Sequence, residues 1–206
     1  MPELEISLGA ARLTRQARAQ QIADGAALMV VEQGCLPLPP EALSQRMGVS
    51  KALVYAYFPS QQSLANHILR DHLAAIAAPV NQLLDEAPAD LAERCIEAYF
   101  EHVATHGPVL HILLGDPFLA GNLEPGVQAL YGRVMRRLAN ALRARLGISR
   151  ADAIPALHIL ATLPEEAGAL VFAGKLDHDL GRALALEMTL GGLEGLAAET
   201  RTTDQV

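Results

Sequence analysis

The segment GVSKALVYAYFPS, residues 48–60, decides how the N-terminal part of this chain folds. Gly48 permits a tight turn, and Ser50 just after it is a good N-cap for a helix over Lys51–Tyr57. A short helix is also expected before the turn, because the prolines at its start fit a first helical turn, where a missing N–H costs little. Two short helices joined by a turn with glycine form a helix-turn-helix, which can place its second helix in the major groove of DNA. The sequence therefore predicts a DNA-binding motif over residues 38–57.

Composition indicates an ordinary globular protein. The chain has 206 residues, of which 51% are hydrophobic, so it can bury a sizeable core in one or two domains. No apolar run approaches the ~20 residues of a membrane span, and an N-terminus with Glu3 and Glu5 lacks the layout of a secretory signal, so we expect a cytoplasmic protein with no membrane partner. Cys35 and Cys95 have no metal-site spacing and are expected to be reduced thiols.

Charge is unevenly distributed along the sequence. The formal net charge is −7, which argues against a protein that coats nucleic acid through a basic surface. Residues 10–72 nevertheless hold six Lys and Arg against four Asp and Glu, a balance of +2, which leaves −9 for the remainder. One module facing DNA and an acidic module facing something else would fit this division.

Helical spacing of Ala, Leu, Arg, Glu and Gln runs through the whole sequence, and alternating strand patterns are nearly absent, so the predicted fold class is all-α with about nine helices. Pro79 should kink or interrupt the fourth helix, and Asp90 with Glu93 resembles a capping box. Residues 107–126 look rich in loops. The helices are expected over about 14–33, 40–47, 51–57, 61–86, 90–106, 124–147, 149–174 and 177–198, with a boundary between modules near 73–88.

The run from Gly48 to Ser60, followed by Leu64, resembles the TetR (tetracycline-repressor) family of bacterial transcription regulators, and this resemblance covers about residues 14–72. It implies a DNA-binding domain of three helices over residues 10–72. It also implies a variable helical domain for ligand binding and dimerisation over residues 73–200. A family member of this kind is a homodimer that binds a palindromic operator and responds to a small-molecule effector.

Carried over by position, Ser50 would cap the recognition helix, Lys51, Ala52 and Leu53 would approach base edges and backbone, and the two tyrosines would bond phosphates. The basic row at the start of the first helix could add phosphate contacts or could be a solvated face. The tyrosines could also be packing residues. The expected DNA-binding residues are Arg15, Arg18, Arg46, Ser50, Lys51, Ala52, Leu53, Tyr55, Ala56, Tyr57 and Gln61.

Two positions depart from the family pattern. Pro39 stands where a Ser or Thr usually caps the second helix, and Gln61 stands where a Lys is common. Losing that Lys removes a phosphate contact, so affinity for DNA and its dependence on salt should both be reduced.

The resemblance also implies a ligand cavity among the middle helices. Its candidate lining residues are large, apolar or amphipathic and lie on those helices, although each could equally belong to the core. Glu165 and Glu166 lie beside Pro164 on an otherwise apolar helix, and one of them facing a cavity would favour a cationic effector over a purely apolar one. The expected ligand-binding residues are Tyr99, Phe100, His102, Val103, His106, Leu110, His111, Leu114, Phe118, Tyr131, Met135 and Glu165.

His102 and His106 are four residues apart, which is metal-ligand spacing on a helix, and His111, Asp116 and His158 are possible further ligands. A histidine in the last turn before Gly107 also interacts favourably with the helix dipole, and this explanation is preferred, so no metal or cofactor is expected.

For the dimer, the family implies a four-helix bundle built from the last two helices of each subunit, where small residues permit close packing. The expected interface residues are Leu157, Leu160, Ala161, Gly168, Val171, Leu184, Met188, Gly191 and Gly195.

The sequence thus favours a regulator, expected to be a repressor and not an enzyme. Two alternatives remain open at this stage. One is a helical metal-dependent hydrolase that uses His102, His106 and a glutamate of the Glu165–Glu166 pair. The other is a dimeric small-molecule-binding protein whose helix-turn-helix has lost DNA binding, as Gln61 and the sparsely polar recognition helix would suggest.

Overall fold

The computed structural model describes residues 14–203, with side chains to residue 198, so Arg12 and the first residues of the expected N-terminal domain lie outside it. Within this range the chain is all-α, as predicted, with nine helices and no strand. The helices are α1 (Arg15–Gln33), α2 (Pro40–Arg46), α3 (Lys51–Tyr57), α4 (Gln61–Glu86), α5 (Leu91–His106), α6 (Val109–Gly115), α7 (Pro125–Leu146), α8 (Arg150–Phe172) and α9 (His178–Thr203).

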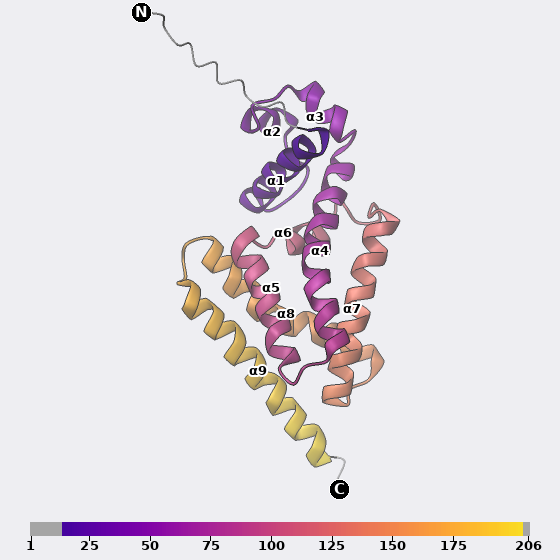
Figure 1. Ribbon diagram of the computed structural model, residues 1–206, viewed down its shortest axis with the longest axis vertical. Helices are drawn as coiled ribbons and strands as arrows, with labels where there is room; N and C mark the ends of the chain where they lie inside the picture. Colours follow the sequence, from indigo (N-terminus) through magenta and orange to yellow (C-terminus); the bar gives the residue numbers. More distant parts are fainter. Residues whose placement is uncertain (1–13, 204–206) are drawn as a thin grey trace, which may run out of the picture.

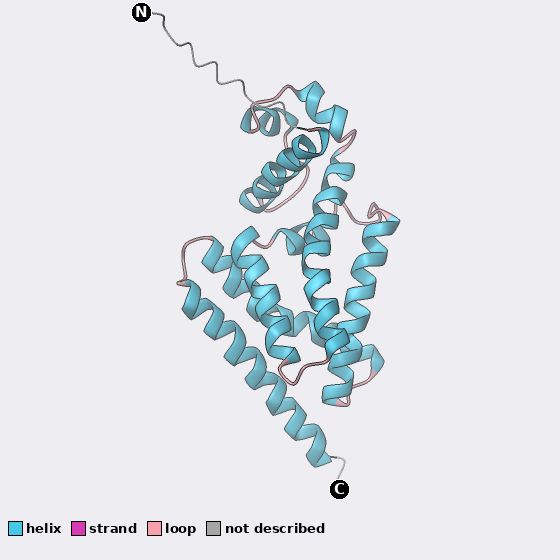
Figure 2. Cartoon of the chain, in the orientation of Figure 1, coloured by secondary structure: helices cyan, strands magenta, loops and turns pink. Residues whose placement is uncertain are grey.

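The described chain is elongated, with α1, α2 and α3 at one end (Figure 1). The long helix α4 leaves this group and runs into a second group, where it packs on α5 and α7. Helix α5 lies against both α8 and α9, and α9 follows the outer edge of the second group toward the C-terminus. Loops are short between these helices (Figure 2). Helix α4 therefore belongs to both halves of the molecule and connects them.

Local sequence signals account for the helix ends. Thr14 caps α1 by accepting a 3.1 Å hydrogen bond from the Ala17 N–H, and Gly34 ends the helix at φ 75°, a conformation that glycine adopts without strain. Ser60 and Ser63 cap α4 reciprocally, each side chain accepting from the backbone N–H of the other. Ser149 caps α8 through the Asp152 N–H, as expected from the sequence.

Three details differ from the sequence-based expectations. Asp90 is the N-cap of α5 but makes no side-chain cap hydrogen bond, so the predicted capping box is wrong. Helix α4 is not interrupted at Pro79, because Ala77, Val80 and Leu83 around this exposed proline are buried and hold the helix against its neighbours. The loop-rich stretch after Gly107 contains a helix, α6, whose seven residues are too few to give a clear period in sequence.

The largest cluster of buried apolar residues joins the two halves. It contains Ile22, Val30, Leu43, Val54 and Phe58 of the first three helices and their flanks, together with the N-terminal half of α4. It also takes in Val109, Leu110 and Leu113 from α6, and Val127 from α7. Helix α6 is therefore part of the core on which the helix-turn-helix rests.

Candidate DNA-binding and effector sites

The helix-turn-helix is built as the sequence indicates. Ser50 accepts a 3.2 Å hydrogen bond from the Leu53 N–H and so caps α3. Gly48 turns the chain at φ 61°, and the Val49 N–H that follows donates to the Ser44 carbonyl at 3.0 Å. Val54 and Phe58 are only 5% and 6% exposed, which anchors one side of α3 in the core. The opposite side of α3 is then fixed toward solvent.

That opposite side carries most of the predicted recognition residues. Lys51, Ala52, Tyr55 and Ala56 are exposed and occupy one face, since they follow one another at helical spacing. Leu53 and Tyr57 are half-buried. The guanidinium of Arg15, at the start of α1, lies 5.9 Å from the centre of the Tyr57 ring, within the range of a cation–π contact. Exposed Arg15 and half-buried Arg18 thus lie on the helix that borders the end of α3.

Gln61 has a structural role that the sequence did not reveal. Its Oε1 accepts from the Leu38 N–H at 3.2 Å, and its Nε2 donates to the Leu38 carbonyl at 3.0 Å. Both ends of the amide therefore hold the backbone of the loop that leads into α2. Gln61 is thus used inside the domain, and its side-chain amide is engaged by the backbone of Leu38.

Two cations of the motif are ion-paired with carboxylates. Lys51 of α3 pairs with Glu41 in the first turn of α2, and Arg46 at the end of α2 pairs with Glu32 through both guanidinium nitrogens. All four side chains are substantially exposed. Hydrogen bonding to these cations lowers the pKa of both Glu41 and Glu32. The predicted DNA contact of Lys51 would therefore require exchange of one partner for another.

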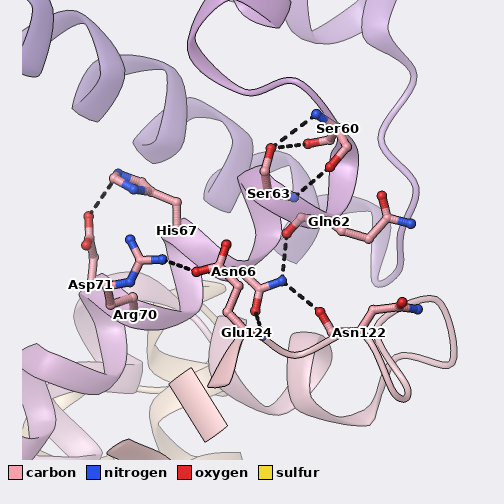
Figure 3. Close-up of polar contacts among 9 residues, drawn as sticks. All are labelled: Ser60, Gln62, Ser63, Asn66, His67, Arg70, Asp71, Asn122 and Glu124. Atoms are coloured by element: carbon pink, nitrogen blue, oxygen red, sulfur yellow. Dashed lines mark hydrogen bonds and ion pairs between the residues drawn. The ribbon is translucent and has the colours of Figure 1, made fainter. Parts of the chain in front are cut away.

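Polar links join the α6–α7 loop to the N-terminal helices. The buried Asp116 accepts from the Leu36 N–H through Oδ2 and from the Phe118 N–H through Oδ1, each at 2.8 Å. Asn66 of α4, which is 1% exposed, donates to the carbonyls of Gln62 and Asn122 and accepts from the Glu124 N–H at 2.7 Å (Figure 3).

Arg70, one turn further along α4, pairs with the Glu124 carboxylate (Figure 3). The loop after α6 is thereby fixed to α4 at three polar groups and to the loop before α2 at one. A displacement of α6 would therefore be transmitted to α4 and to the loop before α2.

In the second group of helices, Glu165 of α8 is the centre of a polar cluster. Tyr99 of α5 donates to its Oε2 at 2.5 Å, and His111 of α6 contacts its Oε1 through Nδ1 at 2.9 Å. Only 19% of the Glu165 side chain is exposed. Burial raises the pKa of Tyr99, and the hydrogen bond to Glu165 raises it further. Tyr131 and His158 form a second polar contact, between α7 and α8, at 3.2 Å.

His102 and His106 lie beside each other, as their spacing indicates, but the third residue next to them is His72 and not His111, Asp116 or His158. Both rings contact His72 of α4, with ring centres 5.1 Å from it in each case and 4.8 Å from each other. His72 Nδ1 lies 3.1 Å from His102 Nε2. Burial lowers the pKa of His72 to about 4 and that of His102 to about 3, with the neighbouring histidines adding to both effects.

These contacts bear on the metal-dependent alternative. Asp116 is used by the backbone of Leu36 and Phe118, while Glu165 is held by Tyr99 and His111. In the part of the chain that the structure describes, no group of three or more His, Cys, Asp or Glu side chains is arranged to hold a metal ion.

The apolar ligand candidates divide between two environments. Leu110, Leu114 and Phe118 pack on the large core cluster beneath the helix-turn-helix, whereas Phe100 and Val103 are buried where α5 meets α8. Met135 is half-buried on α7. A pocket of about 340 Å³ lies elsewhere, between α4 and α5, and none of the predicted ligand-binding residues lines it. Its walls are Pro79, Gln82, Leu83, Arg94, Glu97, Ala98 and Glu101.

The last two helices expose large apolar side chains. Leu184 and Met188, both predicted for the dimer interface, are 40% and 54% exposed, and Ile159 of α8 is 70% exposed. Gly191 and Gly195 continue the same exposed face of α9. The α8–α9 surface, as we name it, consists of Ile154, Ile159, Leu180, Leu184, Met188, Gly191 and Gly195.

Other predicted interface residues pack within the subunit. Leu157 and Leu160 contact the cluster around Leu142, and half-buried Val171 packs beside Phe100. A Cβ on Gly168 would lie 2.8 Å from Val103 Cβ and 3.0 Å from the Phe100 carbonyl oxygen. Gly168 therefore permits close packing of α8 on α5. Ala161 is half-buried on α8.

No helix in the described range has the length and apolar character that crossing a bilayer would require.

Comparison with solved structures identifies the fold. The chain is similar to a TetR-like transcriptional regulator from Rhodococcus sp. RHA1, with a TM-score of 0.66 and 20% identity over 89% of this chain and 100% of the other. It is also similar to PfmR, a TetR family transcriptional regulator from Thermus thermophilus, with a TM-score of 0.59 and 21% identity over 86% of this chain and 97% of the other.

A TetR variant from Acinetobacter baumannii AYE, solved in complex with minocycline, matches with a TM-score of 0.54 and 16% identity over 93% of this chain and 98% of the other. No protein-family model and no curated protein matches the sequence. The described chain therefore has the fold of TetR-type regulators, in agreement with the resemblance seen in residues 48–60.

Proposed function

We propose that this protein is a homodimeric, ligand-responsive transcription regulator, acting as a repressor, that binds a palindromic operator through α3. The observation that carries this proposal is the face of α3: Lys51, Ala52, Tyr55 and Ala56 are exposed while Val54 is buried. A helix presented in this way by a helix-turn-helix fits the major groove. Such a protein acts on the chromosome, which corresponds to the expected cytoplasmic location.

Dimer formation is supported by the α8–α9 surface. Clustered exposed apolar side chains mark interaction sites in soluble proteins, and Leu184 and Met188 lie one helical turn apart on the same side of α9. A second copy would cover Leu184, Met188 and Ile159 and would bring two recognition helices to one duplex. Light scattering should give the mass of a dimer, and Met188→Glu should shift it toward the monomer. Ala144→Glu, which adds the same charge at an exposed position of α7, should leave the mass unchanged.

For the effector, the cluster of Tyr99, His111 and Glu165 offers a carboxylate among aromatic rings with no Lys or Arg among its hydrogen-bond partners. A cation with an apolar body would match this cluster better than an anion, because it would exchange for the His111 contact without leaving Glu165 unpaired. We therefore propose an effector that is apolar or cationic.

Coupling between the two sites is proposed to run through α6 and α4. Helix α6 carries His111 at the effector site and leads directly into Asp116, which holds Leu36 before α2. Asn66 ties the same loop to α4. Release of operator requires that the effector bind the DNA-incompetent arrangement more tightly than the competent one.

The central test is DNA binding itself. DNA selected from a random pool by the purified protein is titrated by fluorescence anisotropy over a series of salt concentrations. A salt-sensitive, palindromic selected site supports the proposal. Absence of any salt-sensitive binding would overturn it in favour of a small-molecule-binding protein that has lost DNA binding, and stoichiometric metal in purified protein would favour the hydrolase.

Effector binding is tested with tetraphenylphosphonium as a lipophilic cation and triphenylmethane as its neutral counterpart. The cationic class is supported if the cation releases the selected DNA from the wild type and no longer releases it from Glu165→Gln. Release by both compounds alike would assign an apolar effector.

A further inference from the structure

Lys51 is the sole charged residue of the helix KALVYAY, and it is already paired. Its ammonium group contacts the carboxylate of Glu41, which projects from the first turn of α2. The two side chains are 49% and 68% exposed, so the pair lies on the surface that α3 would present to DNA. With Glu41 beside it, the positive charge of Lys51 is compensated by a negative charge of the same domain.

We propose that Glu41 is a specificity-determining residue, which competes with DNA phosphate for Lys51 and thereby weakens binding to unrelated sequences more than binding to the operator. This inference rests on the proposed DNA-binding function. It goes beyond that function, because it assigns a role to a carboxylate that makes no favourable contact with DNA itself.

The energetic argument concerns what happens to each charge when DNA docks. An exposed ion pair contributes little to stability, so Lys51 leaves Glu41 readily when a phosphate or base is placed correctly. Glu41 is then left as an unpaired carboxylate close to the negatively charged backbone. On an unrelated sequence Lys51 can add only a phosphate contact, and that contact requires its pair with Glu41 to be broken. At the operator the base contacts of α3 hold the complex whether or not Lys51 leaves Glu41, so the competition weakens non-specific binding more than specific binding and raises the ratio of the two affinities.

The chain offers a matched comparison in the pair of Arg137 and Asp85. It also consists of one cation and one exposed carboxylate, and neither residue is among the expected DNA contacts. Asp85 lies at the C-terminal end of α4, whereas α4 begins at Gln61, just after α3. At 1.5 Å per residue these positions are roughly 36 Å apart, so Asp85 is remote from α3.

The experiment compares the wild type, Glu41→Gln and Asp85→Asn on two duplexes of about 30 base pairs, which is long enough for two half-sites. One carries the sequence selected by the wild type and the other a scrambled sequence. We expect Glu41→Gln to bind the scrambled duplex several-fold more tightly at 50 mM salt. Its loss of affinity between 50 and 200 mM salt should be about threefold greater than for the wild type, as for one additional phosphate contact. The gain on the selected duplex should be smaller.

Asp85→Asn should bind both duplexes like the wild type, and adding Lys51→Gln to Glu41→Gln should remove the gain. Equal gains in Glu41→Gln and Asp85→Asn would reduce the effect to overall charge and overturn the inference. Weaker operator binding by Glu41→Gln would overturn it as well, because Glu41 would then be a base-reading residue. If the wild type binds neither duplex, the proposed function fails and this inference with it. Since the Glu41 side chain is exposed, unchanged thermal unfolding is expected for the variant.

Discussion

The carboxylate of Asp116 accepts a hydrogen bond from the backbone N–H of Leu36, eighty positions earlier in the chain. Asp116 follows α6 directly, and Leu36 belongs to the loop that leads into the helix-turn-helix. The bond therefore connects the helix that carries His111 with the loop that positions α2. It is buried, so water does not compete for either group.

Replacing Asp116 by Ala should destabilise the protein by about 1–3 kcal/mol, because the buried N–H of Leu36 would lose its partner. Urea denaturation measures this loss. Asp90→Asn is a suitable control, since Asp90 caps α5 without a side-chain hydrogen bond, and it should change stability by less than about 0.5 kcal/mol. Equal stability of Asp116→Ala and wild type would show that the bond does not hold the loop.

The histidine cluster predicts a loss of stability in acid. The pKa of His72 is lowered to about 4 and that of His102 to about 3 in the folded protein, whereas an unfolded histidine titrates near 6.5. Well above pH 6.5 the two histidines are neutral in both the folded and the unfolded protein, so they contribute no pH dependence to the free energy of unfolding. Below it the unfolded chain binds protons first, so the free energy of unfolding falls as the pH drops from about 6.5 toward 4.

Asp24 and Asp71 oppose this effect at His72 by raising its pKa, but burial dominates. Thermal unfolding between pH 7 and pH 4.5 measures the slope, which His102→Leu should flatten. If that variant kept the full slope of the wild type, the acid sensitivity would have to be assigned to other groups.

Local signals in the sequence were sufficient to predict the helix-turn-helix. The turn at Gly48 and the cap at Ser50 depend on neighbours within a few positions, so the sequence predicts them correctly. Asp90 shows the limit of the same reasoning, because a capping residue at the expected spacing makes no capping bond.

Contacts between distant segments were beyond such reasoning. His72 is thirty positions from His102 and was not among the partners that the sequence suggested, since helical spacing is visible in a sequence and packing of α4 on α5 is not. Gln61 likewise reads as a missing lysine, and its clamp on Leu38 depends on a tertiary contact between two loops.

Gln61→Lys separates these two descriptions. A lysine at this position should add a phosphate contact. The slope of log affinity against log salt concentration should then become steeper by up to about one unit. It should also lower the free energy of unfolding by about 1 kcal/mol, because the Leu38 backbone loses both hydrogen bonds to the amide. Gln62→Lys adds the same charge at the next position and keeps the clamp, so its stability should match the wild type. A stable Gln61→Lys protein would mean that the loop needs no clamp.

Substitution of Gly168 tests whether this glycine allows close packing of helices inside one subunit or between two subunits. A methyl group there would press on Val103 and on the Phe100 carbonyl, so Gly168→Ala should destabilise the protein by about 1–3 kcal/mol even though alanine favours helices. Gly126 of α7 has no atom within 4 Å of its Cβ direction, and Gly126→Ala should be neutral or slightly stabilising. Denaturation at two protein concentrations distinguishes subunit stability from dimer stability. A loss for Gly168→Ala that disappears at high concentration would return this residue to the dimer interface, whereas a loss independent of concentration places it between α5 and α8.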